Sequence, residues 1–164
     1  MIAQKFPHST IIGIDITENY LEMAKRKLGS YQNVSFVCQD AEELELEEKF
    51  DCIVSSYIPK YCDPKILVPK CIRHLKPGGK IILHDFTFPK NKSVRFFWRL
   101  HFVILRIVGG FIPEWSEAFA KLPKLIQAST WTNGYKAELQ KNGFDVTINH
   151  YTWNCSAILL ATHR

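Results

Sequence analysis

The stretch "HSTIIGIDITENYLEMAKRKL", residues 8–28, places one carboxylate, Asp15, between an apolar run and a helical pattern. The run is short and rich in β-branched residues, as in a strand of a parallel sheet that is buried on both faces. In open α/β sheets an acidic side chain in this position accepts hydrogen bonds from the hydroxyls of a nucleotide ribose. The alternative is a carboxylate that only stabilises the N-terminal end of the following helix.

Polar side chains also end two later strand-like runs. "FDCIVSSYI" closes with Ser55, Ser56 and Tyr57, and "KIILHDFT" contains His84 and Asp85. Ligands collect at such strand ends in open α/β sheets, although a polar turn or a strand-end cap gives the same pattern. Successive strand residues point to opposite faces, so at most one of His84 and Asp85 lines a cleft directly. We favour Asp85 for that position, with His84 as a satisfied surface or core histidine.

The elements that must position these residues alternate along the chain. Strand-like runs near residues 9–16, 33–40, 50–58 and 80–87 are separated by helical or acidic segments, and the helical stretch that ends at "KPGG" contains Pro69. This alternation predicts crossover units and a parallel sheet. The last two runs, "DVTINHYTW" and "CSAILLATH", have almost nothing between them, which permits only an antiparallel hairpin. We therefore predict a mixed α/β sheet with its odd strand at the end.

Composition and charge narrow the class of protein. The chain of 164 residues is 46% apolar and 13% aromatic, enough for one globular domain. Residues 1–63 contain six Lys/Arg and eleven Asp/Glu, whereas residues 64–164 contain fifteen and five. The basic part favours an anionic partner, membrane or nucleic acid, unless it is only a solvated face. Five cysteines without a C-x-x-C pair indicate reduced thiols in a cytoplasmic setting and predict neither a disulfide framework nor a metal site.

The order of several short motifs resembles the class I S-adenosylmethionine-dependent methyltransferases, and more narrowly those of ubiquinone and menaquinone biosynthesis. The matching pieces are "GIDIT", "VSFVCQDAEEL", "FDCIVSSYI", "LKPGGKIILHDFTFP" and the later "AFAKLPKLI" and "YKAELQKNGF". They cover most of the chain. The resemblance implies a Rossmann-like fold, S-adenosyl-L-methionine as cofactor, and methyl transfer to a hydrophobic small molecule such as a prenylated quinol.

The resemblance assigns cofactor contacts to residues of the first two strand ends. Asp15 would bind both ribose hydroxyls, and Ile16 would lie against the adenine. Asp40 would accept a hydrogen bond from the adenine amino group while the backbone N–H of Ala41 meets a ring nitrogen. For Asp40 the alternative is a simple helix cap.

Ser55 and Ser56 would face the methionine part of the cofactor. Carbon methylation of a quinol also requires a base that removes a phenolic proton. The candidates for this base are Asp85, His84 and Tyr57.

The family's glycine-rich turn on a first strand is missing from this chain, because only seven residues precede the run that begins at His8. By the family's strand order, that first strand would lie between the "GIDI" and "FDCIV" strands, at the centre of the sheet. We therefore expect a single methyltransferase-like domain over residues 1–164 that is truncated at its N-terminus and lacks this central strand.

Residues 88–130 form an aromatic and basic insertion on the expected substrate side. If residues 92–110 are helical, ~100° per residue brings four cations within about 60° of one another. These are Lys92, Arg95, Arg99 and Arg106. Apolar side chains occupy much of the remaining circumference: Phe97, Trp98, Phe102, Ile104, Leu105 and Val108. Such a segment predicts peripheral membrane contact through residues 92–112, with a lid helix packed on its own domain as the alternative.

Three other functions compete with an active methyltransferase. A non-catalytic fragment or binding module would keep the fold without the cofactor loop. A nicotinamide-dependent dehydrogenase would also place an acid after its second strand, but the closing antiparallel hairpin disfavours it. A nucleic-acid methyltransferase would use the basic second part, yet a nucleic-acid partner is not favoured here. The protein is predicted to be cytoplasmic with membrane association, and a homo-oligomer is left open.

Overall fold

The computed structural model describes residues 2–110 and 113–163. Contacts within the chain divide it into two compact units, Met1–Leu46 and Glu47–Arg164. We describe each unit by itself.

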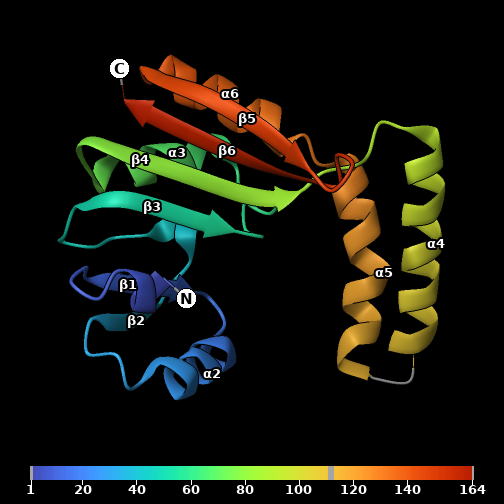
Figure 1. The fold of residues 1–164 in the computed structure, drawn as a ribbon, viewed down its shortest axis with the longest axis horizontal. Coiled ribbons are helices and arrows are strands. Elements are labelled where there is room, and N and C mark those ends of the chain that lie inside the picture. Colours follow the sequence, from blue (N-terminus) through green and yellow to red (C-terminus); the bar gives the residue numbers. More distant parts are fainter. Residues whose placement is uncertain (1, 111–112, 164) are drawn as a thin grey trace. The chain divides into compact units, whose positions relative to one another are not determined.

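The first unit is built around a two-stranded parallel sheet (Figure 1). Its elements are α1 (Ile2–Lys5), β1 (Ile11–Asp15), α2 (Glu18–Leu28), β2 (Val34–Cys38) and the 3-10 helix η1 (Ala41–Glu43). Helix α2 is the crossover between the strands and packs against both, with Leu21 buried. The predicted strand–helix–strand order is therefore confirmed for this part of the chain.

Strand β1 is less covered than the sequence predicts. Its five residues are all half-buried, whereas the β-branched run indicated burial on both faces. A strand in a two-stranded sheet has only one neighbour, which limits how much of its surface other elements can cover.

The second unit contains a four-stranded mixed sheet in the order β3-β4-β6-β5. The strands are β3 (Phe50–Ser56), β4 (Leu75–Phe86), β5 (Phe144–Tyr151) and β6 (Ser156–His163). β3 and β4 are parallel, and β6 is antiparallel to both β4 and β5. The predicted hairpin is confirmed, but the antiparallel strand, although last in the chain, inserts between β4 and β5 and does not form the sheet's edge.

Two helices cover this sheet and complete its core. They are α3 (Pro64–Arg73), which includes Pro69, and α6 (Trp131–Lys141). Helix α6 packs against β5 and β6 and also contacts α3. The sheet and α6 contribute most of the large, deeply buried apolar side chains: Ile81, Leu83, Tyr135, Leu139, Phe144 and Leu159. Ile126, from the later helix Pro113–Ala128, is equally buried.

The expected single sheet is thus present as two separate sheets. Within the described residues β1 pairs with β2 and β3 pairs with β4, and no ladder joins β1 to β3. The break falls between the two strands that the family's strand order separates by a further strand.

Helices α4 (Lys92–Gly109) and α5 (Pro113–Ala128) lie side by side as a helical hairpin (Figure 1). The Asn91 side chain caps α4 by accepting hydrogen bonds from the backbone N–H groups of Ser93 and Val94. Gly110 is the C-cap, so α4 ends at the pair Gly109–Gly110. In residues 2–110 and 113–163 no helix combines the length and apolar character that crossing a bilayer requires.

Burial predicts which cysteine resists modification. Burial raises the pKa of the Cys71 thiol to about 12. At pH 8 only about one in ten thousand such thiols would be thiolate, the reactive form. We expect iodoacetamide at pH 8 to alkylate the exposed Cys38 readily and Cys71 only after unfolding, as measured by peptide mass mapping with and without urea. Equal labelling of Cys38 and Cys71 in the folded protein would contradict this packing.

Candidate functional site

The first unit brings Asp15 and Asp40 to the same edge of its sheet. β1 and β2 are parallel with Asp15 opposite Cys38, so their carboxyl ends coincide, and Asp40 follows two residues after Cys38. The Asp15 Oδ1 accepts a hydrogen bond from the Thr17 N–H at 2.8 Å, and the Asp40 Oδ1 accepts one from the Glu42 N–H at 2.9 Å. Each carboxylate thus fixes a turn through Oδ1.

Each carboxylate can therefore both cap a local turn and contact a ligand, the two roles considered from the sequence. Asp40 is the N-cap of η1, the simple capping role that the sequence left open. The capping contacts use one oxygen of each carboxylate and leave its Oδ2 for a ligand. Beside them, the Ile16 side chain is 65% exposed, and Ala41 is the first residue of η1, where backbone N–H groups have no acceptor inside the helix.

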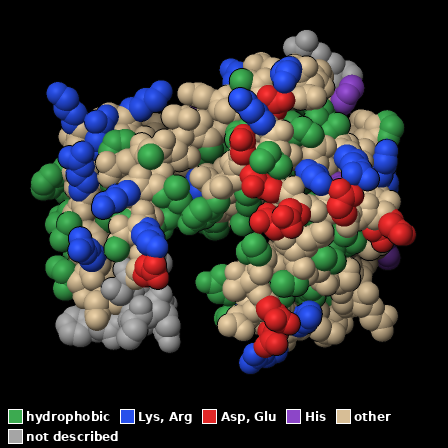
Figure 2. Space-filling model, turned by 180° about the vertical axis from the view of Figure 1, so that it is seen from behind, with side chains coloured by type: hydrophobic (Ala, Val, Ile, Leu, Met, Phe, Trp, Pro, Cys, Tyr) green, Lys and Arg blue, Asp and Glu red, His purple; other side chains and the backbone are tan. Residues whose placement is uncertain are grey.

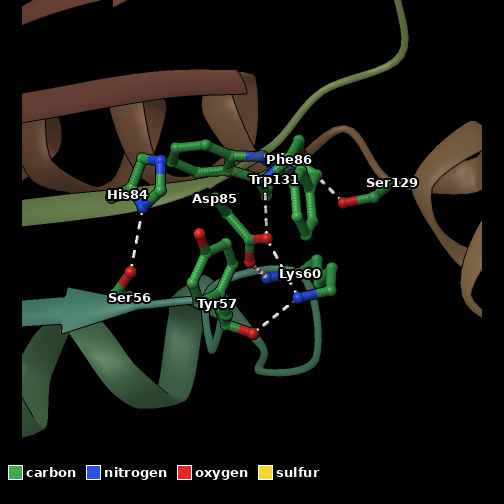
Figure 3. A network of polar contacts seen from close by, with 8 residues as sticks. All are labelled: Ser56, Tyr57, Lys60, His84, Asp85, Phe86, Ser129 and Trp131. Carbon is green, nitrogen blue, oxygen red and sulfur yellow. Dashed lines mark hydrogen bonds and ion pairs between the residues drawn. The ribbon is translucent and has the colours of Figure 1, made fainter. Parts of the chain in front are cut away.

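In the second unit the carboxyl ends of β3 and β4 gather Ser56, Tyr57 and His84 (Figure 3). Ser56 is the register partner of His84, and its Oγ lies 2.9 Å from the His84 Nδ1, a hydrogen bond whose direction depends on the ring tautomer. The Tyr57 ring meets the His84 ring edge-on, with centroids 5.1 Å apart. Ser55 is half-buried on the strand, one residue before this cluster.

The backbone at Tyr57 is strained. Its φ of 66° lies in the left-handed region, which bulky side chains rarely adopt. Two contacts hold this conformation: the Tyr57 N–H donates to the His84 carbonyl at 2.9 Å, and the Lys60 Nζ donates to the Tyr57 carbonyl at 2.6 Å. Such strain persists where the surroundings over-determine it, and it clusters at ligand sites.

Asp85 faces the interior and pairs with Lys60 (Figure 3). The side chains of Lys60 and Asp85 are 2% and 0% exposed. The Asp85 Oδ1 accepts hydrogen bonds from the Lys60 Nζ at 2.9 Å and from the Phe86 N–H at 2.7 Å, and its Oδ2 accepts one from the Lys60 N–H at 2.9 Å. The opposite orientation of His84 and Asp85 is as predicted, but the more open side belongs to His84 and not to Asp85. Both Asp85 oxygens already accept hydrogen bonds within the protein. The role of Asp85 as base remains a prediction that these contacts do not test.

Aromatic rings enclose the Lys60–Asp85 pair. The Lys60 Nζ lies 4.3 Å from the centre of the Tyr61 ring, and the Trp131 Nε1–H donates to the Phe86 carbonyl at 2.8 Å. Burial, together with the negative charge of Asp85, raises the pKa of the Tyr61 hydroxyl. Sequence reasoning missed Lys60 because a lysine in a loop is normally solvated, and no periodic pattern marks it.

Comparison with known proteins defines the class. Residues 1–83, just over half of the 164, match a family described as "Methyltransferase domain". The chain therefore belongs to the methyltransferase-domain family, which confirms the resemblance predicted from the sequence. This membership disfavours the dehydrogenase, and nothing in the comparisons supports a non-catalytic module.

Two curated relatives show which members of the family the chain resembles. It is 29% identical over 160 residues to the ubiquinone/menaquinone biosynthesis C-methyltransferase UbiE of Haemophilus ducreyi, covering 94% of this chain and 61% of that protein. It is 27% identical over 164 residues to UbiE of Pseudomonas entomophila, covering 96% and 63%. The chain thus spans less than two thirds of the length of these relatives.

Solved structures support the fold. The pyocyanin biosynthetic protein PhzM matches with a TM-score of 0.66 and 19% identity, over 99% of this chain and 46% of that one. The N-methyltransferase NodS of Bradyrhizobium japonicum, solved with S-adenosyl-L-homocysteine, matches with a TM-score of 0.59 and 12% identity, over 93% and 65%. At these identities the likeness establishes the methyltransferase fold.

The buried ion pair predicts a stability coupling. Lys60→Met should lower the free energy of unfolding by about 3–5 kcal/mol, because it leaves the Asp85 charge buried without its partner. The double variant Lys60→Met/Asp85→Asn removes that charge and keeps an acceptor oxygen, so it should be more stable than the single variant. Urea unfolding followed by circular dichroism measures both.

The matched control is Lys76→Met, which breaks the exposed Lys76–Asp51 pair and should change stability little. Additive effects of the Lys60 and Asp85 substitutions would contradict a coupled buried pair.

Proposed function

We propose that the protein containing this chain transfers a methyl group from S-adenosyl-L-methionine to a hydrophobic small molecule, and that this acceptor is a prenylated quinol. The observation that carries the proposal is the placement of Asp15 and Asp40 at one edge of the parallel β1–β2 sheet, within the residues that match the methyltransferase domain. The acceptor class is supported by the UbiE relatives, whose name refers to ubiquinone and menaquinone biosynthesis.

The residues of the first unit fit the adenosine part of the cofactor. The Asp15 Oδ2 would accept hydrogen bonds from the ribose hydroxyls while Oδ1 keeps the turn at Thr17 in place. The Asp40 Oδ2 would accept from the adenine amino group, and the Ala41 N–H would donate to a ring nitrogen. The exposed Ile16 side chain offers an apolar surface for the adenine.

In the second unit, Ser55 and Ser56 are the candidates for contacts to the methionine part. When bound, the sulfonium cofactor supplies an electrophilic methyl group, so the protein's main tasks are to orient the acceptor and to exclude water. The hairpin of α4 and α5, within the insertion at residues 88–130, is assigned to the acceptor side of the same methyltransferase-like domain.

His84 is the base that the geometry favours for the phenolic proton. It is only partly buried, and its Nδ1 contact with Ser56 orients the ring. When Nδ1–H donates to the Ser56 Oγ, Nε2 carries no proton. The remaining nitrogen, Nε2, would take the proton from the acceptor hydroxyl, which makes the neighbouring ring carbon nucleophilic. Tyr57 is 48% exposed and contacts the His84 ring, so it would line the site that holds the acceptor.

Asp15→Asn tests the cofactor assignment. The amide oxygen can still accept a hydrogen bond from the Thr17 N–H, but the negative charge is lost. Affinity for S-adenosyl-L-homocysteine should therefore fall about ten- to hundredfold, because the hydrogen bonds to the ribose are no longer charge-assisted. Isothermal titration calorimetry gives the Kd. The control Glu22→Gln removes an exposed carboxylate of α2 that pairs with Arg26, and it should bind as the wild type does. Unchanged affinity of Asp15→Asn would refute this role.

His84→Gln tests the base. With a short-chain prenylated quinol as acceptor, kcat should fall about 10²- to 10⁴-fold while cofactor affinity is retained, and the acid limb of the pH profile should disappear. Ser56→Ala should lower kcat less and leave cofactor affinity unchanged, because it removes only the contact that orients the His84 ring. The control is His150→Gln on β5, an exposed histidine outside the cluster. An unaltered pH profile in His84→Gln would exclude His84 as the base.

A further inference from the structure

Helix α4 has one covered side. Trp98, Phe102 and Leu105 are half-buried and Gly109 is buried, at intervals of four, three and four residues that place them on one side of the helix. Helix α5 lies along α4 in the hairpin (Figure 1). The part of α4 that packs within the protein is therefore a single stripe.

The opposite side of α4 is apolar and exposed. Seven large apolar side chains are 44–66% exposed and span an arc of about 140° at ~100° per residue. We call them the outward apolar face: Phe96, Phe97, Leu100, Val103, Ile104, Ile107 and Val108. An apolar patch of this kind on a folded domain marks an interaction site. It also distinguishes α4 from a lid helix that would bury its apolar side on its own domain.

Cations border the outward apolar face along one side. Lys92, Arg99 and Arg106 are exposed, and the described residues supply no ion-pair partner for them. Arg95 differs, because its guanidinium donates to the Pro89 and Lys90 carbonyls and so fixes the start of α4. Helix α4 contains no Asp or Glu, and Figure 2 shows Lys and Arg side chains gathered over the helical hairpin.

We propose that the outward apolar face of α4 binds the surface of an anionic lipid bilayer, with Lys92, Arg99 and Arg106 at the lipid phosphates. Helix α4 is not long and apolar enough to cross a bilayer. Its apolar arc with cations along one border is the pattern of a helix that lies in the membrane interface. Nucleic acid would use the cations but leave seven apolar side chains in water. Phe111 and Ile112, at the end of the segment predicted to contact a membrane, lie outside the described residues.

The proposal is independent of methyl transfer and is tested without cofactor or acceptor. The full chain is floated with vesicles of phosphatidylcholine alone, and with vesicles of equal parts phosphatidylcholine and phosphatidylglycerol. We expect stronger flotation with the anionic vesicles, declining as salt is raised. Phe97→Ser/Ile104→Ser should reduce binding at least about tenfold on both compositions.

Arg99→Gln/Arg106→Gln should reduce binding to anionic vesicles about fivefold per arginine and remove most of its salt dependence, with little effect on phosphatidylcholine alone. The matched control is Tyr20→Ser/Met23→Ser, which removes two exposed apolar side chains of α2 and should float as the wild type does. Circular dichroism establishes that each variant is folded.

Three results would overturn the proposal. The wild type could fail to float with either composition, or the α4 variants could float as well as the control. In the third result, light scattering shows a dimer that only Phe97→Ser/Ile104→Ser dissociates, while no form binds vesicles. That result would mean that a second copy of the chain covers the face.

Discussion

A charge withdrawn from water has to be paired, and in this protein that constraint organises the end of the four-stranded sheet. Lys60 and Asp85 are both buried, and their contacts tie the loop after β3 to the end of β4. The same lysine holds the Tyr57 carbonyl, which keeps Tyr57 in its left-handed conformation beside His84. The positions of Tyr57 and His84 at the end of this sheet thus depend on the buried Lys60–Asp85 pair.

In the first unit, the pairing of two parallel strands positions the candidate site residues. Because β1 and β2 run in the same direction and in register, Asp15 and Asp40 lie at one edge of the sheet, and each carboxylate caps its own turn. In both units the candidate site residues lie at the carboxyl ends of parallel strands, where open α/β folds bind their ligands. The local turns are built by the same carboxylates that we propose bind the adenosine.

Much of this could be predicted from the sequence, for physical reasons that differ between elements. The apolar runs and the helical periodicity of residues 18–28 identify the strands and α2, since local pattern determines them. The position of β6 between β4 and β5 is set by long-range pairing, and no local signal reveals it. The Lys60–Asp85 pair was missed for the same reason: residues 25 apart in the chain meet only in the folded protein. The two faces of α4 were visible as a pattern, but only the structure shows which face α5 leaves uncovered.

The two units also differ in how much core they possess. Of the described apolar residues that are buried, only Ala3, Leu21 and Leu44 belong to the first unit. A two-stranded sheet with so small a core is of marginal stability, so its backbone amides should exchange with deuterium faster than those of β4 or β6. Since Asp15 and Asp40 are in this unit, any nucleoside that they bind would also slow its local unfolding, and ligand occupancy and order become one linked equilibrium.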